Sequence, residues 1–107
     1  MYATIRRYSY EHGDAKELSR QIEQGFLPVL SKIPGFIAYY VVNSGMSTLA
    51  TVSLFETREG ADQSVRTAAD WVAKNMAAAK LSRPQITAGE VTVHKMIEHA
   101  AGTAFSR

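Results

Sequence analysis

The order of the secondary-structure elements constrains the fold more than any other feature of this sequence. Segments rich in Tyr, Val, Ile and Thr, which are typical of β-strands, alternate with two stretches in which apolar residues recur at helical spacing. Strands are predicted at residues 2–10, 36–42, 47–55 and 90–97, with a tight turn at residues 43–45. The order is therefore strand–helix–strand twice, and the two halves meet in a β-hairpin.

Both helices are marked by a capping residue and an apolar stripe. Asp14 offers a side-chain oxygen to the first free amides of the first helix, and Glu17 completes a capping box. The apolar stripe continues in phase beyond Pro28, which predicts one kinked helix rather than two. Thr57 is the predicted cap of the second helix, which ends before Pro84.

This order of elements points to one architecture. Right-handed crossovers place the first and third strands at the centre of a four-stranded antiparallel sheet and both helices on one face. The expected fold is therefore an α+β, ferredoxin-like βαββαβ sandwich. The 107 residues correspond to one domain, predicted to span residues 1–97, with a C-terminal tail at residues 98–107.

The second face of such a sheet has no helices to cover it. One strand parity is predicted to face the helices, and it comprises Ala3, Ile5, Ala50, Val52, Leu54, Val91 and Val93. The opposite parity, expected on the open face, comprises Tyr2, Thr4, Tyr8, Phe36, Tyr40, Leu49, Phe55 and Met96. Apolar surface of this extent is seldom left in water, so we expect a homodimer through the sheet faces. The alternative is a monomer with an amphipathic open face.

Composition and charge exclude several classes of function. The formal net charge is only +2 and the basic residues are scattered among acidic ones, so no nucleic-acid partner is expected. Cysteine is absent and the three histidines are far apart in sequence, so no metal site is predicted. No apolar run approaches the roughly 20 residues that cross a bilayer, and the N-terminus has no signal-peptide pattern. We therefore expect a cytoplasmic protein without a membrane partner.

Four short segments carry a resemblance to a known family. They are residues 26–30 (FLPVL), residues 33–36 (IPGF), residues 53–57 (SLFET), and Ala61 with Trp71-Val72 in the second helix. Over residues 2 to about 97, the chain resembles the antibiotic-biosynthesis-monooxygenase type of the dimeric α/β-barrel superfamily. The resemblance implies a dimeric α/β barrel with a ligand pocket between the helices and the sheet of each subunit.

Two kinds of chemistry occur in that family. Some members are oxygenases that need neither metal nor flavin, because the anion of an electron-rich phenolic substrate reacts with oxygen directly. Others degrade haem with an Asn on the first strand, a Trp on the second helix and a His soon after it. Trp71 matches this pattern, but the first strand has no Asn and the next His is His94 on the predicted last strand. The resemblance therefore implies an oxygenase-like protein that uses no cofactor.

Arg6 and Arg7 are neighbours on the first strand, so they point to opposite faces of the sheet. A buried guanidinium needs an acidic partner or an anionic ligand, because an unpaired buried charge is costly. With the parity above, Arg7 lies on the helix side and is a candidate catalytic residue that contacts a substrate phenolate or carboxylate. The alternative is that both arginines lie near the strand end and reach water, or pair with Glu56 or Glu90.

Further candidates lie on the second helix and the second strand. Trp71 and Asn75 are predicted catalytic residues, since an indole can stack on an aromatic ligand and an amide can donate a hydrogen bond to it. Ser64 shares their edge of the helix, and Tyr39 lies on the second strand; both are predicted to bind substrate. The alternatives are a half-buried packing Trp and a Tyr of the kind common in strands.

The expected function is a monooxygenase-like activity on a small aromatic or polyketide-like compound. The competing hypothesis is a non-catalytic module of the same fold that binds a small molecule or only assembles. The two differ in one structural requirement, because the enzyme needs an open cavity that Trp71 and a polar group both reach.

Overall fold

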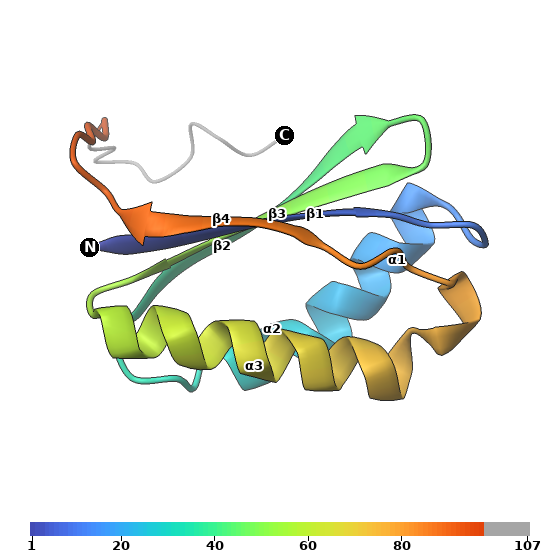
Figure 1. The fold of residues 1–107 in the computed structure, drawn as a ribbon, viewed down its shortest axis with the longest axis horizontal. Helices are drawn as coiled ribbons and strands as arrows, with labels where there is room; N and C mark the ends of the chain where they lie inside the picture. The colour runs from blue at the N-terminus through green and yellow to red at the C-terminus, as the bar shows by residue number, and fades with distance from the viewer. Residues whose placement is uncertain (98–107) are drawn as a thin grey trace.

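The computed structural model describes residues 1–97 and has the expected architecture. The strands are β1 (Tyr2–Ser9), β2 (Phe36–Gly45), β3 (Thr48–Phe55) and β4 (Gln85–Glu90), which pair antiparallel in the order β2–β3–β1–β4. The helices are α1 (Ala15–Gln21), a π-helical turn (Ile22–Phe26), α2 (Leu27–Leu30), α3 (Arg58–Asn75) and a 3₁₀ turn (Ala77–Ala79). Figure 1 shows the helices on one side of the sheet. The α+β, ferredoxin-like fold is thus confirmed, while the predicted tail lies outside the described residues.

Both helices begin at the predicted capping residues. Asp14 Oδ1 accepts a hydrogen bond from the Glu17 amide at 2.9 Å, and Thr57 Oγ1 accepts one from the Gly60 amide at 3.1 Å. The Glu17 carboxylate does not close the predicted capping box, because it accepts hydrogen bonds from Arg20 instead. Local hydrogen bonding therefore fixes where each helix starts.

The first helix is continuous across Pro28, as predicted, and a π-helical turn lies just before the proline. The chain passes from α1 through the π-helical turn into α2, and Pro28 lies in the first turn of α2. The π-helical turn shifts the hydrogen-bond register just before the proline, whose nitrogen cannot donate. Ile22 and Phe26 of this turn are buried in the core between helices and sheet.

The faces of β1 and β3 are the reverse of the predicted ones, whereas Tyr40 of β2 lies on the open face as predicted. The buried, helix-facing residues of β1 and β3 are Thr4, Arg6, Tyr8, Leu49, Thr51, Ser53 and Phe55. The residues predicted to face the helices lie on the open side instead: Ala3, Ile5, Ala50, Val52 and Leu54. The reason is size, because large side chains such as Phe55 and Leu49 fill the space below the sheet, which an alanine cannot do.

The fourth strand lies earlier than predicted, at Gln85–Glu90 rather than at residues 90–97. β1 begins at Tyr2, which pairs with Glu90, so later residues have no strand beside them. Val93, which was predicted to face the helices, is 87% exposed beyond the sheet. The alternation of valines in this segment predicted a strand, but the length of β1 decides where pairing ends.

The β2–β3 hairpin also turns later than the predicted residues 43–45. β2 continues to Gly45, and the turn is made by Met46 and Ser47, whose φ angles are 53° and 59°. Two successive positive φ angles are typical of the two-residue hairpin turn that suits the twist of the strands. The hairpin itself is confirmed.

Candidate functional site

A group of polar side chains is buried at the centre of the helix-facing side of the sheet. In the β1–β3 ladder, Arg6 lies opposite Thr51 and Thr4 lies opposite Ser53. The exposed fraction of these four residues is 3% or less. Large apolar side chains, such as Phe55, occupy the ends of the same strand faces. Short side chains between long ones leave unfilled space over the middle of the sheet.

Arg6 is buried, and two of the three guanidinium nitrogens have no hydrogen-bond partner among residues 1–97. Its Nε and Nη1 atoms make no hydrogen bond, and no carboxylate among the described residues forms an ion pair with it. The hydroxyl oxygens of Thr4, Thr51 and Ser53 are buried without partners as well. A buried charge without a partner destabilises a fold by several kcal/mol. This group of atoms therefore suits an anionic ligand, together with ordered water.

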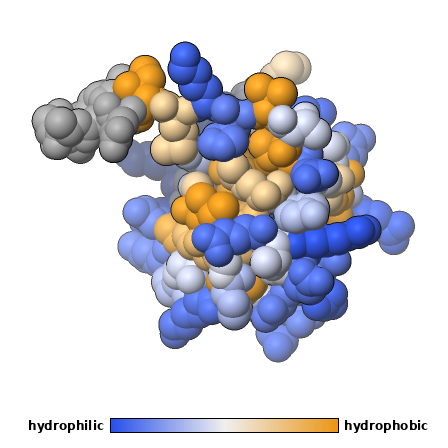
Figure 2. All heavy atoms as spheres, turned by 90° about the vertical axis from the view of Figure 1, so that its left-hand side faces the viewer, coloured by the Kyte–Doolittle hydropathy of each residue, from blue (hydrophilic) through white to orange (hydrophobic). Residues whose placement is uncertain are grey.

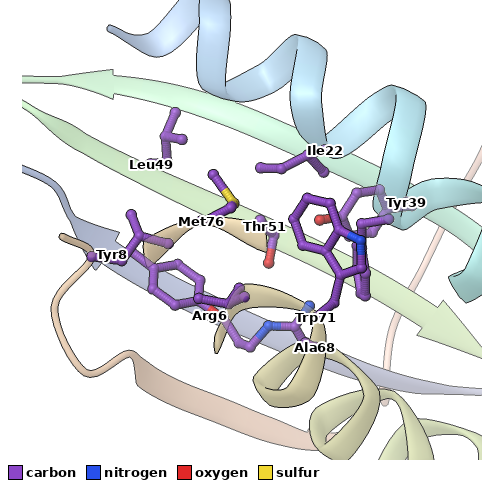
Figure 3. A pocket seen from close by; sticks show the side chains of 12 residues that line it. Arg6, Tyr8, Ile22, Tyr39, Leu49, Thr51, Ala68, Trp71 and Met76 are labelled. Carbon is purple, nitrogen blue, oxygen red and sulfur yellow. The ribbon is translucent and has the colours of Figure 1, made fainter. Parts of the chain in front are cut away.

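A small cavity lies beside Arg6, between the sheet and the helices (Figure 3). Arg6 from β1, Tyr39 from β2 and Thr51 from β3 supply its polar groups, and Trp71 from α3 forms one wall. The rest of the lining is mainly apolar and comprises Tyr8, Ile22, Phe26, Leu49, Ala68, Val72, Met76 and Leu81. The cavity volume is about 20 Å³, which holds a water molecule but not an aromatic ring.

The hydroxyl of Tyr39 is a hydrogen-bond donor at neutral pH rather than a base. Burial raises the pKa of Tyr39 to about 12, although the nearby Arg6 guanidinium opposes this rise. The phenol therefore keeps its proton throughout the physiological range. In this position it can donate a hydrogen bond to an anion that binds beside Arg6.

Trp71 is held in place by the first helix. Its ring centroid lies 5.5 Å from that of Phe26, which in turn meets the Tyr39 ring edge-on at 5.8 Å. Gly25 allows this close approach, because a Cβ atom there would lie only 2.7 Å from Cζ2 of Trp71. Aromatic contacts at these distances stabilise a fixed arrangement, so the indole forms a defined wall of the cavity.

The structure brings two of the predicted site residues, Trp71 and Tyr39, to the same cavity. Arg7 is exposed on the open side of β1, so the prediction that it faces the helices is wrong. The strand parity is reversed, and Arg6 takes the position that was expected for Arg7.

Ser64 and Asn75 lie apart from the cavity. Ser64 is completely buried, and its hydroxyl donates to the Ala61 carbonyl at 2.6 Å. Asn75 is exposed on the outer side of Trp71, and its Nδ2 donates to the Trp71 carbonyl at 3.0 Å. In this conformation both side chains bond to their own helix.

Sequence reasoning missed Arg6 and Thr51 because it placed the more apolar parity inside. The size pattern along β3 was the available signal. Leu49 and Phe55 are large and share one parity with Thr51, whereas Ala50 on the other parity is too small to reach the helices. An arginine at the corresponding parity of β1 is then expected to point into the interior.

Two further kinds of site were sought among the described residues: a metal site and a membrane-spanning helix. No group of three His, Cys, Asp or Glu side chains within residues 1–97 is arranged to hold a metal ion. No helix in the same part of the chain is both long and apolar enough to span a membrane. The functional groups that line the cavity are one guanidinium, several hydroxyl groups and aromatic rings.

Comparison with known proteins identifies related structures but no related sequence. No family model matches the chain, and no curated protein does either. A protein of unknown function from Nitrosomonas europaea is 24% identical, with a TM-score of 0.69 over 92% of this chain and 95% of that one. SnoaB of Streptomyces nogalater, a cofactor-independent oxygenase crystallised as a single-site mutant, is 10% identical, with a TM-score of 0.65 over 87% and 94%.

A haem-type ligand is present in another matched structure. A single-site mutant of MhuD, with two manganese protoporphyrin IX molecules per active site, is 16% identical, with a TM-score of 0.68 over 90% and 99% of the two chains. Other matches include a protein of Deinococcus radiodurans assigned to the antibiotic biosynthesis monooxygenases and a dimeric ferredoxin-like protein. The predicted resemblance to these monooxygenases is therefore confirmed at the level of the fold.

Proposed function

We propose that this protein is a cofactor-independent, monooxygenase-like enzyme that acts on a small aromatic or polyketide-like compound. The observation that carries the proposal is the buried guanidinium of Arg6, which forms no ion pair within residues 1–97 and borders a cavity walled by Trp71. The structural neighbours support the proposal, because they include a cofactor-independent oxygenase. The substrate anion would bind Arg6 and accept a hydrogen bond from Tyr39.

The proposed reaction needs no external reductant. Arg6 stabilises the anion that forms when an electron-rich phenolic substrate loses a proton to water, and the product takes a proton back from water after the reaction. A ring methylene of this anion then reacts with O₂ and becomes a carbonyl. One oxygen atom stays in the product, and the other leaves as water with the two hydrogens of the methylene. Trp71 orients the ring by stacking on it.

The cavity must widen before such a ring can bind. At about 20 Å³ it is far smaller than the roughly 300 Å³ at which ligand pockets begin. Met76 is part of the lining, and its unbranched side chain has three rotatable bonds and adapts readily. We therefore expect Met76 to change rotamer when substrate binds.

Oxygen consumption tests the proposal directly. Dihydroxyanthrone, which combines phenolic hydroxyls with a ring methylene, is added to the protein in an oxygen electrode, and the rate without protein is subtracted. We expect uptake of one O₂ per product carbonyl, at least about tenfold slower for Arg6→Met and unchanged for the matched control Arg7→Met. A rate equal to that of buffer, across a panel of such phenols, would count against the enzyme.

The alternative is a non-catalytic module that binds a small molecule or only assembles. The small volume of the cavity favours it, because a site this full gives a ring little room to react. Binding without oxygen uptake would support this alternative. Haem is a further ligand to test by titration with haemin, and we expect no Soret band because the cavity of about 20 Å³ has no room for it.

We also propose that the protein is a homodimer that packs through the open face of the sheet. Ile5, Tyr40 and Val42 lie on this face and are 39%, 55% and 45% exposed. In Figure 2 hydrophobic atoms reach the surface mainly in the upper and central part, while the lower part, on the helix side, is mostly hydrophilic. A second copy covers such a face most simply, with a two-fold axis.

A further inference from the structure

A groove runs between α3 and β4 on the helix side of the sheet. α3 packs over β1 and β3, whereas every residue of β4 is exposed. Ile86 of β4 points toward the helix side, because it pairs with Arg6, and it is 46% exposed. The groove has a volume of about 210 Å³ and is thus far roomier than the cavity beside Trp71.

Arg6 lies between this groove and the inner cavity. Its side chain lines both spaces, together with Tyr8 and Val72. A ligand in the groove would therefore lie against the Arg6 side chain without entering the inner cavity. Because Arg6 is only 2% exposed, an anion bound to it would be largely shielded from water.

The walls of the groove are apolar on both sides. On α3 the lining residues are Val65, Ala69, Val72 and Ala73, and on the opposite side they are Pro84 and Ile86. No acidic residue of the described chain lines the groove. The Ser82 hydroxyl at its edge already accepts a hydrogen bond from the Ser9 amide. The positive charge of Arg6 is therefore unmatched at the end of an apolar groove.

We propose that the groove binds an elongated amphipathic anion, whose carboxylate pairs with Arg6 and whose apolar body lies between α3 and β4. Small side chains at Ala69 and Ala73 leave the width that this body needs. The inference rests on the proposed ligand site at Arg6 and names the class of ligand that the site takes. It does not depend on the oxygen chemistry.

Calorimetric titration with benzoate, 4-ethylbenzoate, 4-butylbenzoate and 4-hexylbenzoate tests the inference. We expect the affinity to rise about threefold to fourfold for each added methylene group until the groove is full, because each methylene leaves water. The neutral 4-hexylbenzamide should bind at least about tenfold more weakly than 4-hexylbenzoate, since it cannot pair with the guanidinium.

Four variants, two of them controls, test where the carboxylate and the apolar tail of the ligand bind. Arg6→Met should lower the affinity for every benzoate at least about tenfold, and Arg7→Met should leave it unchanged. Ala73→Leu should abolish the gain from the tail, so that 4-hexylbenzoate binds no better than 4-ethylbenzoate, while benzoate affinity stays as in the wild type. Gln63→Leu adds the same side chain at an exposed position outside the groove and should change nothing.

Affinity that is independent of tail length, or a tail effect that survives Ala73→Leu, would overturn the inference. So would equal binding by Arg6→Met and the wild type. The binding results and the oxygen-uptake results test the two proposals independently. Tail-dependent binding without oxygen uptake supports the groove and contradicts the oxygenase, whereas oxygen uptake with compact phenols and no binding of benzoates does the reverse.

Discussion

Arg6 and Arg7 are adjacent in sequence but lie in opposite environments. Arg6 is 2% exposed under the sheet, and its Nε and Nη1 atoms have no acceptor among the described residues, whereas Arg7 is exposed on the open face. The pleat of β1 alone produces this difference, because successive side chains point to opposite faces. Burial of the Arg6 charge therefore lowers the stability of the fold, whereas the solvated charge of Arg7 does not. Features that lower stability in this way are common at ligand-binding sites.

The two faces of the sheet differ in the same way. The helix side is closed by large apolar residues but holds polar hydroxyls at its centre, around Arg6. The open side carries exposed apolar side chains, such as Ile5 and Tyr40, beside the charged Arg7. We therefore assign ligand binding to the first face and assembly to the second.

The largest expected effect tests the assembly face. Val52→Asp places a carboxylate at the middle of the open side of β3, where two copies would bury it. We expect the dimer to weaken at least about a hundredfold, with the monomer still folded. Light scattering after size-exclusion chromatography measures the mass, and circular dichroism checks the fold.

The matched control for assembly is an acidic substitution on the surface of α3. Gln63→Glu adds the same charge away from the sheet and should leave the dimer intact. If Val52→Asp and the wild type have the same mass at all concentrations, the open face is not the dimer interface.

A smaller effect tests the charge of Arg6. Arg6→Met keeps a long side chain but removes the buried charge, so the free energy of unfolding without ligand should rise by about 3 kcal/mol. Arg7→Met removes an exposed charge and should change it by less than about 0.5 kcal/mol. Urea denaturation at one fixed protein concentration compares the three proteins. Loss of stability in Arg6→Met would mean that Arg6 has a partner in the folded protein.

The sequence predicts the parts of this fold that depend on nearby residues. The caps at Asp14 and Thr57 follow from local signals. The strand order follows from the order of the elements along the chain and the handedness of their crossovers. The end of β4 does not, because it depends on where β1 begins, more than eighty residues earlier.

The candidate site was harder to predict, because it depends on which side of each strand the helices cover. Both parities of β1 and β3 contain apolar residues, so alternation alone did not fix the inner face. Trp71 was predicted because an indole can stack on an aromatic ligand and because it matches the family pattern, and Tyr39 was predicted from its place on the second strand. Arg6 was missed because its role follows from strand parity alone.

Alkaline pH offers a test confined to the helix side. The pKa of Tyr39 is raised to about 12, from an ordinary value of 10.0 in the unfolded chain. The stability that the neutral phenol contributes is therefore complete below about pH 10 and is lost as the pH rises through 12, by about 2–3 kcal/mol in total. Ultraviolet titration of the phenolate, as the difference between wild type and Tyr39→Phe, should show a midpoint near 12. A midpoint near 10 would mean that water reaches the Tyr39 hydroxyl.

The smallest effect concerns the wall formed by Trp71. Gly25→Ala places a Cβ atom 2.7 Å from Cζ2 of Trp71, so the indole or the π-helical turn must shift. The clash should outweigh the gain in helix propensity and lower the free energy of unfolding by about 1 kcal/mol. Gly89→Ala is the matched control, because nothing lies within 4 Å of its added Cβ, and it should have little effect. In the double variant Gly25→Ala, Trp71→Phe the smaller ring removes the clash, so the penalty of the alanine should largely disappear. If the penalty remains, the cost lies in the helix itself, and Trp71 is not the wall that Gly25 holds in place.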